Sequence, residues 1–163
     1  MKTLSKLLVL FALITSSAFL FANTISVENA YVREVPPGVP TSALFLTLKN
    51  TSNTDIALIK VNGDIAKNIE LHEHVHKDGM MEMRQVDKIN VVAKGTTELK
   101  PGGFHIMLIG LTKSIKAGDQ VKLTLKFDNG SKLTIKPTVK KVMQGMMKQD
   151  MKMPKNHKMD SMK

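Results

Sequence analysis

Between residues 24 and 137, apolar and polar residues alternate in short segments, and turn-forming residues separate one segment from the next. Alternation with a period of two is typical of strands that bury one face. No stretch before residue 137 shows the 3.6-residue period of an amphipathic helix. The predicted strands span residues 25–28, 43–48, 56–61, 69–75, 81–86, 104–111, 120–127 and 132–135.

Short strands at near-regular spacing favour an all-β fold, either an antiparallel sandwich or a barrel. A length of 163 residues suits a single domain. The chain contains no cysteine. It therefore has no disulfide framework, and thiol catalysis, iron–sulfur clusters and cysteine-bound zinc are excluded.

Residues 1–22 have the pattern of a secretory signal peptide. Two lysines precede an apolar run over residues 7–21, and the small residue Ala22 follows it. A membrane anchor is the alternative, but the run is short and no charge cluster that would stop transfer comes after it. We expect cleavage after Ala22, with Ala18 as the second choice, and no lipid anchor, because no cysteine follows.

The most specific feature of the sequence is a group of histidines and methionines in its middle. His72, His74 and His76 recur at every second position, so they share one face of the predicted strand. Residues 77–79, Lys-Asp-Gly, indicate a hairpin turn directly after them.

The returning strand of this hairpin carries methionines on the face that the histidines occupy. With a two-residue loop, His74 lies opposite Met83 and His76 lies opposite Met81. A loop longer or shorter by two residues would change the partners but leave the side chains on the same face.

A second segment repeats the combination of imidazole and thioether. Phe104, Ile106 and Leu108 form an apolar face that suits a core, so His105 and Met107 point the other way. A lone methionine in a strand usually fills a core, but core filling does not explain histidines and methionines that alternate together on two segments. The pattern indicates a metal site.

The donor types select the metal. Thioether sulfur is a soft ligand that favours Cu(I) over Zn²⁺, Mg²⁺ or Ca²⁺. A blue-copper site needs a cysteine thiolate, and a hydrolytic zinc site uses three histidine or carboxylate ligands with an open position. The Asp and Glu residues form no paired constellation for catalysis. We therefore expect a site that holds and passes on copper, not an enzyme.

The sequence resembles the PCu(A)C family of periplasmic copper chaperones. The family signature is a histidine, ten residues, a methionine, twenty-one residues and His-x-Met, and His72, Met83, His105 and Met107 match it. The segment at residues 99–108 also looks like the family. The resemblance implies a cupredoxin-like, Greek-key β-sandwich that binds Cu(I) through these four residues near its surface. It also implies export to the periplasm and delivery towards the copper centre of cytochrome c oxidase.

His74, His76 and Met81 are additional candidate ligands beside the four. Many relatives have a methionine four residues after the first histidine, where this chain has His76. For the two histidines we favour the alternative that they simply face solvent.

Residues 140–163 differ in character, with seven of the twelve methionines, seven lysines and no aromatic residue. Such a segment buries too little apolar surface to offset its ordering entropy, so we expect a flexible tail. Some members of the resembled family carry a similar extension implicated in extra copper binding, which implies Cu(II) or a second Cu(I) here. The alternative is a basic tail whose methionines scavenge oxidants or touch a membrane. The candidate tail ligands are Met143, Met146, Met147, Met151, Met153, His157, Met159 and Met162.

Together these observations predict a signal peptide over residues 1–22, a PCu(A)C-like domain over 23–139 and a tail over 140–163. The expected partners are copper and a client, cytochrome c oxidase or another periplasmic copper protein. We expect a monomer, without membrane insertion once the signal peptide is removed. A copper-storage or tolerance protein without a client is the alternative function.

Two further classes of binding protein fit the sequence poorly. Aromatic residues make up only 4% of the chain, which argues against a carbohydrate-binding module. The net charge of +10 is compatible with nucleic-acid binding, but the lysines are scattered and the signal peptide directs the chain away from nucleic acid.

Overall fold

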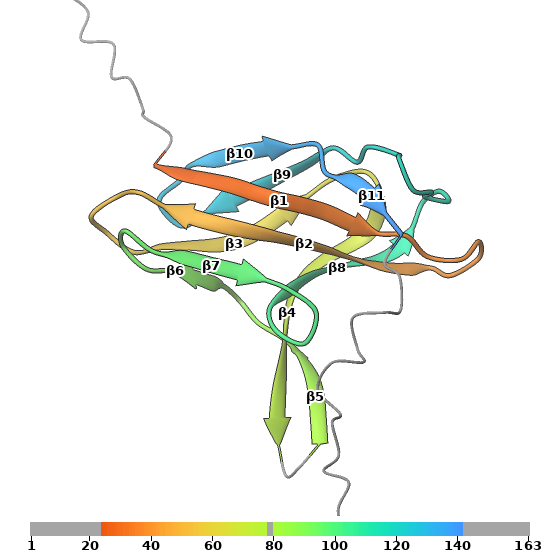
Figure 1. Ribbon diagram of the computed structural model, residues 1–163, viewed down its shortest axis with the longest axis horizontal. Helices are drawn as coiled ribbons and strands as arrows, with labels where there is room; N and C mark the ends of the chain where they lie inside the picture. The colour runs from red at the N-terminus through yellow and green to blue at the C-terminus, as the bar shows by residue number, and fades with distance from the viewer. Residues whose placement is uncertain (1–23, 78–79, 142–163) are drawn as a thin grey trace, which may run out of the picture.

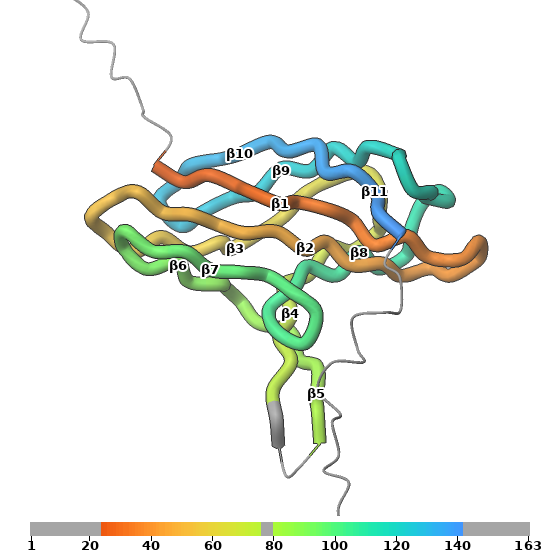
Figure 2. Tube along the Cα trace, viewed as in Figure 1, coloured from red at the N-terminus to blue at the C-terminus, as the bar shows by residue number. Residues whose placement is uncertain are grey.

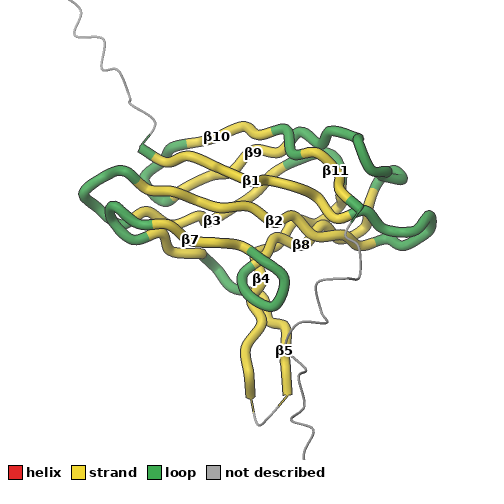
Figure 3. The backbone as a smooth tube through the Cα atoms, in the orientation of Figure 1, coloured by secondary structure: helices red, strands yellow, loops and turns green. Residues whose placement is uncertain are grey.

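The computed structural model describes residues 24–77 and 80–141. These residues form eleven strands and no helix (Figure 3), so the predicted all-β fold is confirmed. Within this part of the chain no helical segment is available to cross a membrane. The strands are β1 (Ile25–Arg33), β2 (Thr41–Asn50), β3 (Ile56–Asn62), β4 (Ala66–Lys77), β5 (Met80–Gln85), β6 (Ile89–Val91), β7 (Thr96–Leu99), β8 (His105–Leu111), β9 (Leu123–Phe127), β10 (Lys132–Ile135) and β11 (Thr138–Lys140).

Two sheets make up the fold (Figure 1). A seven-stranded sheet has the order β11-β1-β2-β8-β4-β5, with β7 also paired to β2, and a four-stranded sheet has the order β10-β9-β3-β6. The predicted sandwich is confirmed, but it is not purely antiparallel, because β11 runs parallel to β1. Pro137, which cannot donate a ladder hydrogen bond, lies where the chain leaves β10 and enters the other sheet as β11.

Some strand boundaries differ from the sequence prediction for local reasons. Strands β6, β7 and β11 were not predicted, whereas β10, which has four residues, was; strands of three or four residues show little alternation. The strand predicted from residue 120 begins at Leu123, because Gln120 forms an isolated bridge with Thr138. Strand β1 continues past residue 28 through a bulge, where Asn29 adopts a φ of 54°.

The core is formed by the apolar residues that alternate along the strands of both sheets. Leu44, Leu58, Leu108 and Leu123 have no exposed surface, and each contributes to one continuous cluster. This core makes the central strands of the seven-stranded sheet a rigid support for the side chains on its other face.

Strands β4 and β5 form a hairpin that extends beyond the rest of the sandwich (Figures 1 and 2). The first half of β4 pairs with β8 and the second half with β5, and His72 is the residue that pairs with both strands. The predicted register of the hairpin is confirmed: His74 lies opposite Met83, and His76 lies opposite Met81.

The remaining sequence predictions fall on other parts of the chain. The predicted signal peptide, residues 1–22, and all the candidate ligands of the tail lie outside the described residues. Of the predicted tail, Lys140 belongs to β11 and Lys141 is the last described residue.

Candidate metal centre

Strand β8 carries His105 and Met107 on the face that points away from the core. Between and beside them, Ile106 and Leu108 have no exposed surface and belong to the core, as the alternation predicts. Strand β8 lies between β2 and β4, so hydrogen bonds on both edges set the direction of its side chains.

The imidazole of His105 is covered, although it lies on the outer face of its sheet. Its residue is only 3% exposed, because other rings pack against it. The ring of His74 stacks on it at a centroid distance of 4.9 Å, and the ring of Phe45 lies 6.4 Å away. The site predicted near the surface therefore includes one imidazole with almost no exposed surface.

Gly103 holds both of these histidines from the loop before β8. Its carbonyl oxygen accepts a hydrogen bond of 2.9 Å from Nδ1 of His105 and one of 3.3 Å from the backbone N–H of His74. In contrast, Nε2 of His105 is buried and has no hydrogen-bond partner among the described residues.

His72 lies directly across from His105 on the neighbouring strand. The centroids of the two rings are 5.9 Å apart. Nε2 of His72 is 2.9 Å from Oε2 of Glu70, whereas its Nδ1 is buried without a partner in the described part of the chain. Nδ1 of His74 is likewise buried and has no hydrogen-bond partner among the described residues.

A cavity of about 590 Å³ opens beside these rings. Its wall includes His74, His105 and three methionines, and the turn between β1 and β2 closes its other side. Met81 and Met83 remain about half exposed, at 52% and 47%, so their thioethers are accessible from solvent. The three methionines on the wall are Met81, Met83 and Met107.

The candidate residues are thus distributed in a definite way. His74, Met81, Met83, His105 and Met107 line the cavity, and His72 contacts this group through His105 without lining the cavity itself. For His76 the structure gives the strand position, opposite Met81.

Sequence reasoning missed three residues that shape the site: Glu70, Gly103 and Phe45. Glu70 lies two positions before His72 on the same strand face, and this spacing was the signal that could have identified it. Gly103 and Phe45 act through the tertiary structure, one through a loop carbonyl and the other from β2.

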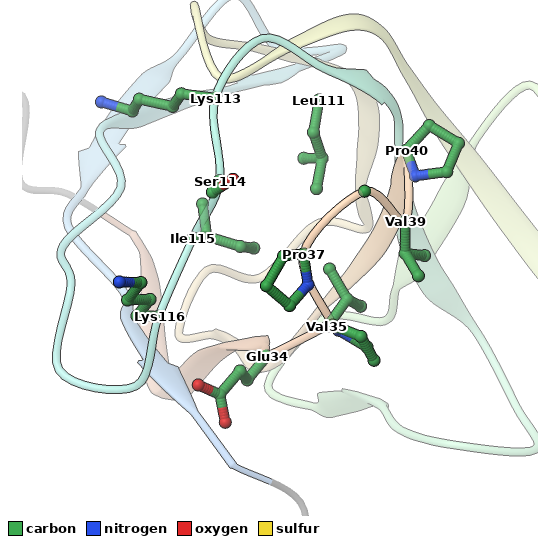
Figure 4. Close-up of a pocket in the computed structure, with 12 residues that line it drawn as sticks. Glu34, Val35, Pro37, Val39, Pro40, Leu111, Lys113, Ser114, Ile115 and Lys116 are labelled. Atoms are coloured by element: carbon green, nitrogen blue, oxygen red, sulfur yellow. The ribbon is translucent and has the colours of Figure 1, made fainter.

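A second cavity, of about 370 Å³, lies between the β1–β2 turn and residues 111–116 (Figure 4). Ile115, Pro37 and Val35 form its apolar wall, and Glu34, Lys113 and Lys116 lie at its edge. None of its lining residues is a histidine or a methionine. It therefore has no soft donor, and we do not consider it a copper site.

The donors around the first cavity are neutral and soft. Across residues 24–77 and 80–141, no three histidine, aspartate or glutamate side chains group into a metal site of their own. The cavity instead brings imidazole nitrogen together with thioether sulfur. This is the donor chemistry that suits Cu(I).

Burial lowers the pKa of His105 below its ordinary value. The hydrogen bond that His105 donates to the carbonyl oxygen of Gly103 opposes this shift, and the neighbouring His74 and His72 add to it. The imidazole is therefore neutral at neutral pH, which is the state that binds a metal.

We expect this lowered pKa to make the metal-free protein less stable in mild acid. In the unfolded chain this histidine takes up a proton near its ordinary pKa of about 6.5, whereas folded His105 stays neutral at that pH. The free energy of unfolding is therefore at its full value above that pH, and it declines as the pH falls towards the pKa of folded His105. Urea unfolding between about pH 7.5 and pH 5 measures the decline. The free energy of unfolding is expected to depend less steeply on pH in the variant His105→Gln. An unchanged dependence on pH would contradict a lowered pKa of His105 as the cause.

Comparison with known proteins identifies the family. The family described as "Putative lipoprotein LpqE-like" matches residues 25–139. A protein from Leifsonia xyli subsp. xyli named "Putative lipoprotein Lxx21020" is 32% identical over 120 residues, which cover 73% of this chain and 71% of that protein.

Solved structures of copper-binding domains have the same fold. The solution structure of Cu(I)-bound DR1885 from Deinococcus radiodurans is 36% identical, with a TM-score of 0.59 over 71% of this chain and 76% of that one. The copper-bound PCuAC domain from PmoF2 is 21% identical, with a TM-score of 0.62 over 73% and 94% of the two chains, and shows the fold alone. This chain therefore belongs to the LpqE-like family, and its predicted resemblance to the PCu(A)C copper chaperones is confirmed.

Proposed function

We propose that this protein is an exported copper metallochaperone that binds Cu(I) beside β8 and passes it to another protein. One observation carries the proposal: two adjacent imidazoles, each with a buried nitrogen that has no partner among the described residues, lie next to a cavity walled by three thioethers. A buried nitrogen without a partner is costly, and a soft cation bound there would satisfy it. The Cu(I)-bound structure of DR1885 supports the choice of metal.

The ligands in this proposal are His72, Met83, His105 and Met107. The two histidines are neighbours across β4 and β8, and Met107 follows His105 on the same face. Met83 comes from β5 and is about half exposed, so the site has one donor within reach of a partner protein. Thioether ligands are uncharged and exchangeable, which suits transfer of Cu(I) more than permanent retention.

His74 is the strongest of the additional candidate ligands. It lines the cavity, lies opposite Met83, and has a buried Nδ1 without a partner in the described part of the chain. His76 and Met81 form the next pair towards the hairpin tip. We propose that His74 assists the entry or departure of copper, and that His76 and Met81 contribute less.

The donor set of imidazoles and thioethers favours transfer of copper over catalysis. The client in our proposal is cytochrome c oxidase or another periplasmic copper protein. The signal-peptide pattern of residues 1–22 supports export, as do relatives named as lipoproteins. These 163 residues contain no cysteine, so they offer no thiol for a lipid. We propose a periplasmic monomer without nucleic-acid binding.

The tail adds seven methionines and one histidine to the chain, and we propose that it binds additional copper. This number of donors also favours a second function, storage of copper without a client. Deletion of the gene distinguishes the two functions. Loss of copper from the oxidase, corrected by excess copper in the medium, supports delivery, whereas copper sensitivity with a normal oxidase supports storage.

Metal analysis combined with X-ray absorption tests the copper site directly. The measurement compares the full chain with a version that ends after Lys141. We expect one Cu(I) in the shortened protein with both sulfur and nitrogen ligands, and additional sulfur-bound copper in the full chain. A shortened protein that binds no Cu(I), or binds it without sulfur, would contradict the proposal.

A further inference from the structure

The hydrogen bond between Glu70 and His72 determines which nitrogen of His72 carries its proton. A carboxylate only accepts hydrogen bonds. Because Oε2 of Glu70 is 2.9 Å from Nε2 of His72, the proton lies on Nε2 and the lone pair lies on Nδ1. This Nδ1 is the nitrogen that is buried without a partner among the described residues.

His105 is prepared in the same way but through the opposite nitrogen. The carbonyl oxygen of Gly103 also only accepts, so the hydrogen bond of 2.9 Å puts the proton of His105 on Nδ1 and the lone pair on Nε2. Nε2 of His105 is likewise buried and has no partner in the described part of the chain. Two facing strands thus present two imidazole lone pairs, each set by an acceptor on the far side of its ring.

We propose that Glu70 is a positioning residue of the copper site, which fixes His72 for binding through Nδ1 while His105 binds through Nε2. This inference rests on the proposed function. Glu70 lies opposite Met107 in the β4–β8 ladder, so the same strand pairing that assembles the ligands also brings in the carboxylate. A carboxylate that accepts from the second nitrogen of a ligating histidine holds the ring and raises its basicity.

The partial burial of this pair strengthens the argument. The side chain of His72 is 14% exposed and that of Glu70 is 28% exposed, so solvent replaces their hydrogen bond only in part. Rotation of the ring by half a turn would put Cε1 in the place of Nε2 and so lose the hydrogen bond to the carboxylate. The structure therefore favours one ring orientation before copper arrives.

His74 lacks this preparation. Its Nδ1 is buried, but the structure records no acceptor for its side chain within residues 24–77 and 80–141. Its ring is held by stacking on His105. The hydrogen bond to Glu70 therefore sets the tautomer and ring orientation of His72, whereas no such hydrogen bond within the described residues sets those of His74.

The test combines NMR of the metal-free full chain with Cu(I) affinity. Two-bond ¹H–¹⁵N correlations report the tautomer of each histidine, and competition with a chromophoric Cu(I) chelator reports affinity. In the wild type we expect His72 with its proton on Nε2. In Glu70→Ala we expect a mixture of tautomers and a Cu(I) affinity lower by about 10- to 100-fold. Glu70→Gln keeps an accepting oxygen and should restore the Nε2–H tautomer and most of the affinity.

A matched control comes from the same hairpin. Glu82 lies opposite Val75, on the face away from the histidines, and is exposed. Glu82→Ala is expected to leave the tautomer of His72 and the Cu(I) affinity unchanged. A proton on Nδ1 of His72 in the wild type overturns the inference, as does a Glu70→Ala protein with unaltered tautomer and affinity. If the wild type itself fails to bind Cu(I), the proposed function fails. If the wild type and Glu70→Ala bind Cu(I) equally well with the same tautomer, only the role of Glu70 fails.

Discussion

Replacement of both Met83 and Met107 by leucine is expected to weaken Cu(I) binding by more than about 100-fold, since loss of an outer-shell partner alone costs about 10- to 100-fold. Leucine has nearly the volume of methionine, so the exchange removes the thioether donors at little cost in stability, less than about 1.5 kcal/mol. Met83 is about half exposed, which makes the fold still less sensitive to its replacement. Competition with a chromophoric Cu(I) chelator again measures the Cu(I) affinity.

Met80→Leu provides the matched control for this double variant. Met80 belongs to the same strand, β5, but lies opposite Lys77 on the other face, and it is 71% exposed. Its replacement should leave the Cu(I) affinity unchanged. Cu(II) binding should also decline less than Cu(I) binding in the double variant, because the imidazoles remain and Cu(II) depends less on soft sulfur. Full retention of Cu(I) affinity in the double variant would exclude thioether ligation.

Truncation of the core in the second sheet is expected to have the largest effect on stability. Phe127 on β9 is 2% exposed and lies opposite the fully buried Leu58 of β3. Phe127→Ala should lower the free energy of unfolding by about 3–5 kcal/mol, through lost burial and the cavity that remains. Since whole domains are stable by about 5–15 kcal/mol, this variant should be only marginally folded.

Urea unfolding followed by circular dichroism measures this loss. Phe127→Leu serves as the control, because it keeps an apolar side chain and should lose less stability than Phe127→Ala. The fraction of Phe127→Ala that is folded should bind Cu(I) with wild-type affinity, because the sheet of β9 contributes no candidate ligand. A loss of less than about 1 kcal/mol would show that the site collapses around the missing ring.

The hairpin illustrates how far local pattern determines a site. Alternation places His72, His74 and His76 on one face, and the Asp-Gly sequence after them predicts a two-residue turn, so the pairing of His74 with Met83 could be predicted. These features act over a few residues, where backbone geometry leaves few choices. The bulge at Asn29 and the short strands β6, β7 and β11 depend instead on pairing with distant strands, and no local pattern predicted them.

The sequence by itself determined the all-β class, the faces of the strands, the register of the β4–β5 hairpin and the soft character of the donors. Only the tertiary structure decided that His72 lies beside His105, because this contact requires β8 to pair with β4 across 33 positions of the chain. The same pairing brought Glu70 opposite Met107, and the pairing of β2 with β8 placed Phe45 beside His105. Long-range strand pairing is driven by burial of the shared core, which is a property of the whole domain, so the neighbours of each ligand cannot be derived from any segment alone.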